Sequence, residues 1–202
     1  MMKYEWKKQE KELYIPKTEP QIITVPRQKF FAIKGKGDPN GSEFSERIGV
    51  LYSLAYAVRM MPKSGFTPEG YFEYTVYPLE GVWNGGNAAD KSSFVYTIMI
   101  RQPEFVTGGV VETAIENTKR KKPHPLLAEA FFCEIEDGLS VQMLHVGDYD
   151  DEPLSFEKMN KFIADNGLVR NSGEHREIYL SDPGKTERDK QKTVLRYCVD
   201  RK

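Results

Sequence analysis

Two parts of this chain repeat the same order of a strand, a polar loop and a helix, and this repeat is the strongest constraint on the fold. KFFAIKGKGDPNG begins at Lys29 and LSVQMLHVGDYDD begins at Leu139, and in each an apolar run ends in Gly-Asp. Apolar residues at helical spacing follow both runs, so that residues 46–51 align with residues 157–162. The sequence therefore predicts an internal duplication.

Two strands are expected after each helix, at residues 71–81 and 94–101 in the first half and at 175–184 and 193–199 in the second. QIITVP and FFCEIED precede the two halves as possible pairing strands, the second with a turn at Asp137-Gly138. We therefore expect an α+β fold of two tandem strand–helix–strand–strand modules, related by a pseudo-two-fold axis, whose antiparallel sheets form a ligand groove.

The expected organisation is a single domain over residues 1–202. Its parts are module one at about 20–104, a connector helix at about 107–127 and module two at about 130–200.

Composition argues against several classes of function. The net charge of −1 lacks the positive charge that dominates nucleic-acid affinity, so we expect no nucleic-acid partner. No apolar run approaches the ~20 residues of a membrane span, and the charged N-terminus has no signal-peptide pattern. Cys133 and Cys198 lie in apolar runs, which indicates free thiols in a reducing cytoplasm. The cysteines and histidines show no metal-ligand spacing, so we expect no metal and no cofactor, while the oligomeric state stays open.

The alternation in HREIYLSDP, from His175 to Pro183, raises the possibility of a ligand site. Ile178 and Leu180 face one way, as a core face does, and Glu177 and Tyr179 face the other. If the apolar faces carry the helices, the opposite faces of the two modules meet around a cleft with aromatic walls and a carboxylate floor. The residues expected to line this one cavity are Glu73, Tyr77, Trp83, Glu177 and Tyr179, and His145 is a further candidate for ligand binding.

Each of these residues also has a purely structural explanation. A glutamate on the outer face of an antiparallel sheet, such as Glu177, is usually solvated. Tyr179 can be a cross-strand packing partner, and Trp83 can be a core anchor. His145 lies in an apolar strand, where a hydrogen-bonded core histidine is the common case. The sequence alone leaves both interpretations open.

Five stretches of this chain resemble the stand-alone GyrI-like small-molecule-binding proteins. They are PLEGVW, IRQPEFVT, KKPHPLL, VQMLHVGDYDDEP and HREIYLSDPGKT, within a resemblance that covers roughly residues 20–199. The resemblance implies a pair of strand–helix–strand–strand modules. It also implies kinship with the effector domain of BmrR-type multidrug-responsive regulators, in which an acidic residue in an aromatic cleft meets cationic or planar drugs. Some stand-alone members hydrolyse the activated cyclopropane of DNA-alkylating natural products.

Glu177 and Tyr179 match the family pattern directly, whereas other positions depart from it. Asn84 stands where relatives usually carry a second tryptophan, Asp148 where they often have proline, and Arg176 where they often have histidine. The wall and charge of the cleft therefore differ from those of relatives, and neither ligand nor activity transfers directly. Only about 20 residues precede the first expected strand, so we expect no DNA-binding region of the kind that the regulators carry.

Three functions fit these features. The first is sequestration of aromatic or cationic small molecules, because tyrosine and tryptophan stack and a carboxylate selects cations. The second is hydrolysis, with Glu177 activating water and Tyr179 donating to the charge that develops on the substrate. The third is a protein–protein modulator that resembles a gyrase inhibitor, which the weak net charge of −1 makes the least favoured.

Overall fold

A computed structural model of the chain describes residues 3–84 and 90–202. Its main feature is a single antiparallel sheet with the strand order β1-β6-β9-β8-β3-β4-β2-β5, to which β7 adds beside β9. The strands are β1 (Gln21–Val25), β2 (Gln28–Lys36), β3 (Leu79–Asn84), β4 (Val95–Gln102), β5 (Phe131–Ile135), β6 (Gly138–Val146), β7 (Leu168–Arg170), β8 (His175–Tyr179) and β9 (Lys192–Arg201).

Five α-helices accompany the sheet in the described ranges: α1 (Trp6–Gln9), α2 (Lys11–Tyr14), α3 (Ser42–Arg59), α4 (Gly108–Lys121) and α5 (Glu152–Asp165). Short 3-10 turns are η1 (Met61–Ser64), η2 (Lys91–Ser93), η3 (Pro125–Ala128), η4 (Tyr149–Asp151) and η5 (Arg188–Lys190). Within these described parts of the chain, no helix has the length and apolar composition needed to cross a membrane.

The predicted duplication is confirmed by the order of the strands. Module one contributes β2, α3, β3 and β4, and module two contributes β6, α5, β8 and β9. Within the sheet, the order β6-β9-β8 in one half mirrors the order β2-β4-β3 in the other. The halves join where β3 pairs with β8, with Gly81 opposite Glu177. The pseudo-two-fold axis passes beside this pair, so that Trp83 and Tyr179 occupy equivalent positions.

The two outer strands are exchanged between the modules, which the sequence did not predict. β1 pairs with β6 of module two, and β5 pairs with β2 of module one. No hairpin forms at Asp137-Gly138, because β5 continues into β6 as one extended segment and β1 continues into β2 in the same way. Pairing between the modules brings Phe132 opposite Phe31, with ring centroids 5.6 Å apart, so the exchange also extends the core.

The strand expected at residues 71–81 is largely absent, and this prediction was wrong. Only β3, which begins at Leu79, forms a strand, and one isolated bridge joins Tyr4 to Tyr74. Pro78 has no N–H to donate to a ladder, so it favours the end of a strand at this point. The alternating aromatic residues instead pack around Phe105, which lies 5.5 Å from Phe72 and 6.0 Å from Tyr74 between ring centroids.

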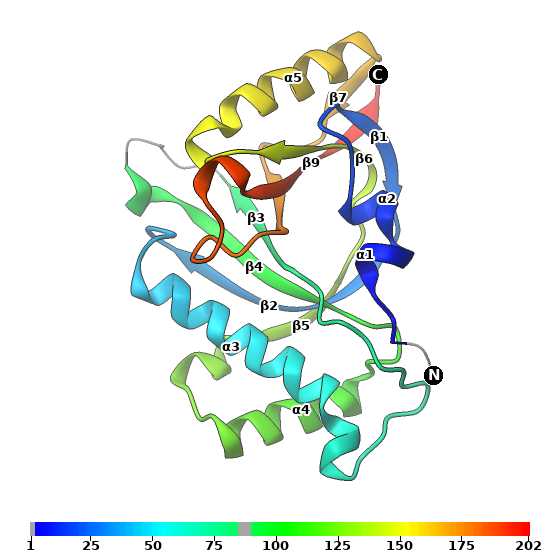
Figure 1. Cartoon of the computed structure of the whole chain (residues 1–202), viewed down its shortest axis with the longest axis vertical. Helices are drawn as coiled ribbons and strands as arrows, with labels where there is room; N and C mark the ends of the chain where they lie inside the picture. The colour runs from blue at the N-terminus through cyan, green and yellow to red at the C-terminus, as the bar shows by residue number, and fades with distance from the viewer. Residues whose placement is uncertain (1–2, 85–89) are drawn as a thin grey trace.

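The helices of both modules cover one face of the sheet, and α4 lies beside α3 (Figure 1). Leu51, Leu54 and Val58 of α3 belong to the larger apolar core, together with Phe31 and Ile98 of the strands below. A smaller core forms under α5, where Met159 and Ile163 pack with Val141, Met143 and Leu195. Because each helix has its own core, the boundary between the modules runs along the centre of the sheet.

The opposite face of the sheet carries a buried network of charged groups. Asp137 accepts hydrogen bonds from Arg176 at 2.7 Å and from Arg196 at 3.2 Å. Arg176 also donates to Glu80 at 2.9 Å, and Arg196 donates to the carbonyl oxygen of Leu13 at 3.2 Å. The network therefore links β8, β3 and β9 to the N-terminal segment. Charges removed from water in this way are stable only while every member keeps its partner.

Asp137→Asn tests this network. The substitution removes a negative charge that Arg176 and Arg196 share, so the free energy of unfolding should fall by about 3–5 kcal/mol. Glu136→Gln is the matched control, because the neighbouring Glu136 is 53% exposed and pairs with Arg27 on the surface. Denaturant titration should show a change within about 0.5 kcal/mol for the control. Equal effects of the two substitutions would contradict the assigned role of Asp137.

Candidate functional site

Three of the predicted site residues lie together at the junction of the modules. Trp83 of β3 donates from Nε1 to the hydroxyl of Tyr179 at 2.9 Å. Tyr179 donates in turn to Oε2 of Glu177 at 2.7 Å. Because β3 and β8 are adjacent and antiparallel, alternate residues of both strands point to the same face. We call Trp83, Tyr179 and Glu177 the junction cluster.

Gly81 makes room for the junction cluster. A Cβ atom at this position would lie 2.8 Å from Nε1 of Trp83 and 3.2 Å from the hydroxyl of Tyr179, which is too close without displacement. Gly81 is also the residue directly opposite Glu177. Because Gly81 has no side chain, the Trp83 indole and the Tyr179 hydroxyl can occupy the space beside it.

The Glu177 carboxylate is buried and well supplied with donors. Its side chain is 10% exposed, and Oε1 lies 2.9 Å from Nε2 of His175 while Oε2 accepts from Tyr179. The rings of Phe156 and Tyr197 flank His175, with centroids 4.8 Å and 6.4 Å away. Packing thus holds the imidazole, and through it the carboxylate, in one orientation.

The expected assignment of the two faces was wrong. The junction cluster lies on the helical side of the sheet, where Phe44 of α3 packs 6.0 Å from Trp83. Ile178 alternates with Glu177 and Tyr179 along β8 and therefore lies on the other side with Arg176 and its neighbour Arg196. The N-terminal segment folds over this side, where Leu13 accepts a hydrogen bond from Arg196. Because helices cover one face and residues 3–19 cover part of the other, both sets of alternating side chains are buried. Alternation alone cannot identify the helical face of such a strand.

Tyr149 and Glu152 lie beside the junction cluster, and no feature of the sequence had singled them out. The Tyr149 ring meets that of Tyr179 at 84°, with centroids 6.2 Å apart. Glu152, the first residue of α5, is only 7% exposed. Burial, and then the negative charge of Glu177, raise the pKa of Glu152 to about 10. In the acidic run DYDDE this residue is the buried one, but only the helix position reveals it.

The tyrosines of the site are hydrogen-bond donors at neutral pH. Burial, followed by the charge of Glu177, raises the pKa of Tyr179 well above its ordinary value. Burial likewise raises the pKa of Tyr149 to about 12, with a further contribution from Glu152. Both phenols therefore keep their protons, and Tyr179 can donate to an oxygen that gains negative charge.

Glu73 and Tyr77 lie outside the junction cluster, so the prediction of one shared cavity was wrong for them. Glu73 is 58% exposed and pairs with Arg59 at 3.2 Å. Tyr77 is buried, donates to Glu10 at 2.7 Å and stacks with Arg101, whose Cζ lies 4.7 Å from the ring centroid. Both were placed in that cavity on the expectation of a strand over residues 71–81, which forms only from Leu79 onward.

His145 is buried with both ring nitrogens occupied. Nδ1 lies 2.9 Å from Oγ of Ser155, and Nε2 lies 2.9 Å from the carbonyl oxygen of Asp148. These contacts tie β6 to the start of α5, which carries Glu152. His145 therefore holds the start of α5 against β6 and makes no contact with the junction cluster among the hydrogen bonds of the described residues.

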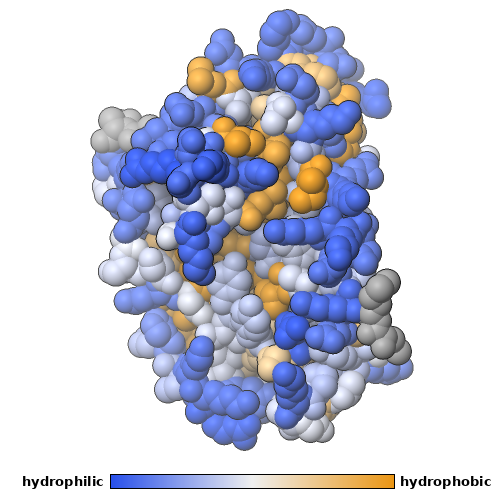
Figure 2. Space-filling model, in the orientation of Figure 1, coloured by the Kyte–Doolittle hydropathy of each residue, from blue (hydrophilic) through white to orange (hydrophobic). Residues whose placement is uncertain are grey.

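The segment between β8 and β9 is seen between α3 and α5 in front of the sheet (Figure 1). Arg188 in this segment pairs with Asp148 at 3.2 Å, which ties it to the start of α5. Figure 2 shows that pale and apolar atoms run along the middle of this face, between strongly hydrophilic margins.

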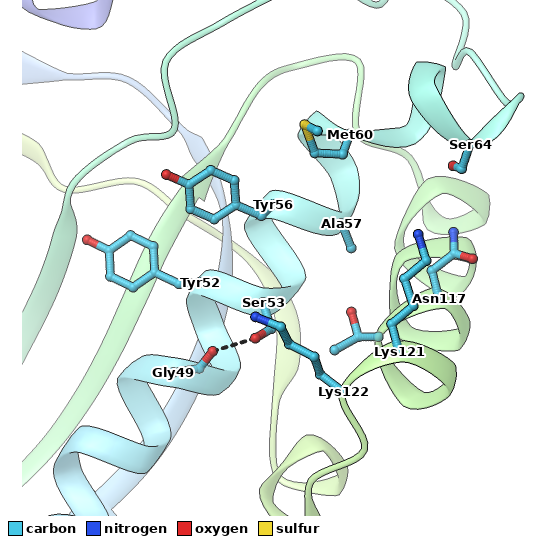
Figure 3. Close-up of a pocket in the computed structure, with 11 residues that line it drawn as sticks. Gly49, Tyr52, Ser53, Tyr56, Ala57, Met60, Ser64, Asn117, Lys121 and Lys122 are labelled. Atoms are coloured by element: carbon cyan, nitrogen blue, oxygen red, sulfur yellow. Dashed lines mark hydrogen bonds between the residues drawn. The ribbon is translucent and has the colours of Figure 1, made fainter.

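Two hollows formed by the described residues lie elsewhere on the molecule, and neither is lined by the junction cluster. One, of about 450 Å³, lies between α3 and α4, and Figure 3 shows that Tyr52 and Tyr56 on its margin project away from Lys121 and Lys122. The other, of about 560 Å³, lies on the far face of the sheet beside Arg176. Both hollows lie outside the junction cluster, whose hydrogen bonds run from Trp83 through Tyr179 to Glu177.

Tyr179→Phe tests the chain of hydrogen bonds. The chain has two tryptophans, and the indole N–H of Trp6 donates to the carbonyl oxygen of Val76 at 3.0 Å, away from the junction cluster. In the NMR spectrum of isotope-labelled protein, the substitution should shift the indole N–H resonance of Trp83, which loses its acceptor. The Trp6 resonance should stay in place as an internal reference. Equal shifts of both, or no shift, would contradict the bond from Trp83 to Tyr179.

Known proteins resemble this chain in sequence and in structure. The family profile of the GyrI-like small molecule binding domain matches residues 18–199. A hydrolase from Listeria innocua superposes with a TM-score of 0.94 at 36% identity, covering 98% of this chain and 100% of its own. An uncharacterized conserved protein from Listeria innocua gives 0.92 at 37% identity, with the same coverage.

A more distant structure shares the fold alone. The C-terminal domain of EcmrR superposes with a TM-score of 0.57 at 12% identity, covering 91% of this chain and 98% of its own. A comparison with curated proteins finds no match. With the family profile matching nearly the whole described chain, this protein belongs to the family of GyrI-like small molecule binding domains.

Proposed function

We propose that this protein binds aromatic small molecules at the junction cluster and adds water to a strained, electrophilic ring. The observation that supports this proposal best is the continuous chain of hydrogen bonds from Trp83 through Tyr179 to Glu177. It joins an aromatic wall, a proton donor and a base within one buried group. The Listeria innocua relative at 36% identity is described as a hydrolase, which favours catalysis over binding alone.

The proposed reaction balances its atoms and protons within the junction cluster. Glu177 takes a proton from water as the water oxygen bonds to a ring carbon. The ring C–C bond breaks, and its electron pair moves to a conjugated carbonyl oxygen, which takes the proton of Tyr179. Glu177 then returns its proton to Tyr179 along the 2.7 Å hydrogen bond. The phenol and the carboxylate end the cycle as they began it.

Binding without turnover is the second candidate, and the buried charge of Glu177 favours it for cationic ligands. A carboxylate among the aromatic rings of Trp83, Tyr149 and Tyr179 attracts a planar cation by charge and by ring quadrupole. The same residues serve both functions, so only a measurement of product formation separates them. A role as a protein–protein modulator remains the least favoured, because the net charge of −1 does not resemble that of an acidic mimic of DNA.

Glu177→Gln and Tyr179→Phe test the hydrolytic role. With a spirocyclopropyl cyclohexadienone as substrate, mass spectrometry of the free product should show the addition of one water by the wild type. Turnover should fall by ~10²–10⁴-fold in Glu177→Gln, which loses the base. It should fall by ~10²–10³-fold in Tyr179→Phe, which keeps the ring and loses the donor. Glu73→Gln is the control, since Glu73 lies elsewhere, and it should leave turnover unchanged.

Calorimetry with a cationic dye, rhodamine 6G, and an uncharged dye of similar shape tests the binding role. If the protein only sequesters ligands, wild-type turnover is absent and Glu177→Gln weakens the cationic dye more than the neutral one. If Glu177→Gln altered neither turnover nor binding, both functions would be wrongly assigned to this residue.

A further inference from the structure

Glu152 is a buried acid to which the proposed reaction assigns no step. It begins α5, where its side chain is 7% exposed, while the preceding Asp150 and Asp151 are exposed. Its carboxyl group hydrogen-bonds to that of Glu177. Its Oε1 atom is buried and has no hydrogen-bond partner among the described residues. A carboxyl group in this position needs a physical explanation, because burial without full pairing costs stability.

Two carboxyl groups within hydrogen-bond reach cannot both carry a negative charge, so one of them holds a proton. The surrounding donors decide which one. Glu177 receives hydrogen bonds from Tyr179 at 2.7 Å and from His175 at 2.9 Å, and these favour its charged form. Glu152 has no such donors around Oε1, and burial with the charge of Glu177 raises its pKa to about 10. The proton therefore belongs to Glu152.

The other charged groups around Glu152 agree with this assignment. Asp148, in the turn before α5, adds negative charge and raises the pKa of Glu152 further. In the segment between β8 and β9, Arg188 pairs with Asp148 at 3.2 Å, while Lys185 and Lys190 pair with Asp182 and Glu187 of the same segment. His145 is engaged with Ser155 and with the backbone of Asp148. The N-terminus of α5 favours the charged form of Glu152, and burial together with the charges of Glu177 and Asp148 outweighs this effect.

We propose that Glu152 is a positioning residue: a protonated acid that donates a hydrogen bond to Glu177 and keeps Glu177 as the single charged carboxylate of the junction cluster. Only its consequence for turnover rests on the proposed function. With donors from Tyr179, His175 and Glu152, three of the roughly four lone-pair positions of the Glu177 carboxylate are filled. The remaining position is where a water molecule or a ligand N–H would bind.

Glu152→Gln, Glu152→Ala and the control Glu157→Gln separate this role from simple packing. Glutamine keeps the shape and a neutral N–H donor but cannot hold the acidic proton, whereas alanine removes both. Glu157 is an exposed residue of the same helix. In the infrared difference spectrum near neutral pH, wild type minus Glu152→Gln should show the carbonyl band of a protonated carboxylic acid. Wild type minus Glu157→Gln should not show this band.

The pH dependence of stability gives a second measurement that needs no ligand. Because the pKa of Glu152 in the folded protein, about 10, exceeds that of an unfolded glutamate, folding takes up a proton. The contribution of this proton to the free energy of unfolding is fully present at acid pH. It is lost as the pH rises toward about 10, the pKa of Glu152 in the folded protein. Between pH about 6 and about 9, the melting temperature of Glu152→Gln should therefore rise relative to the wild type, and that of Glu157→Gln should not.

Turnover of the spirocyclopropyl cyclohexadienone completes the test. Glu152→Gln should keep most of the wild-type rate, because it still donates to Glu177. Glu152→Ala should lose roughly ten- to a hundredfold, the effect of one hydrogen bond to a charged group.

The possible outcomes distinguish this inference from the proposed function. An absent infrared difference, or an unchanged pH dependence of the melting temperature in Glu152→Gln, would show that Glu152 holds no proton and would overturn the inference. Equal losses of turnover in Glu152→Gln and Glu152→Ala would overturn the positioning role. If the wild type gives no turnover while the infrared band and the pH dependence are as expected, the hydrolytic function fails and the proton on Glu152 is still supported.

Discussion

The pairing of β3 with β8 is the contact on which the rest of the structure depends. It joins the two modules into one sheet and sets Gly81 directly opposite Glu177. On one side of these strands it creates the junction cluster, and on the other it brings Glu80 within 2.9 Å of Arg176. A shift of this pairing by one residue would exchange the two sides and destroy both arrangements.

The duplication gives the site its chemistry because equivalent positions carry different residues. Gly81 is the equivalent of Glu177, so one module supplies space and the other supplies the charge. Trp83 is the equivalent of Tyr179, and the indole donates to the phenol. Glu80 is the equivalent of Arg176, so the axis is crossed by an ion pair. Two identical modules would place like charges or two carboxylates at these points, which repel each other.

Much of the fold was predictable from the sequence because the duplication leaves a periodic pattern of apolar residues. Trp83, Glu177 and Tyr179 could also be selected, since they fall in or beside strands whose ends were recognisable. Glu73 and Tyr77 were misplaced because aromatic residues that alternate, then reach Pro78, resemble a strand while packing as a loop. Glu152 could not be singled out, because its burial depends on how α5 meets β8. Local sequence carries no information about such contacts between distant segments.

The exchange of β1 and β5 has a consequence for how the chain holds together. Each module completes its sheet with a strand that belongs, in sequence, to the other, as the partners in a domain-swapped dimer do. A cut in the connector between α4 and β5 would therefore release no independent half. The two fragments would stay interlocked, each with a strand inserted into the other. Covalent continuity between the modules is thus less important to their association than the reciprocal insertion of strands.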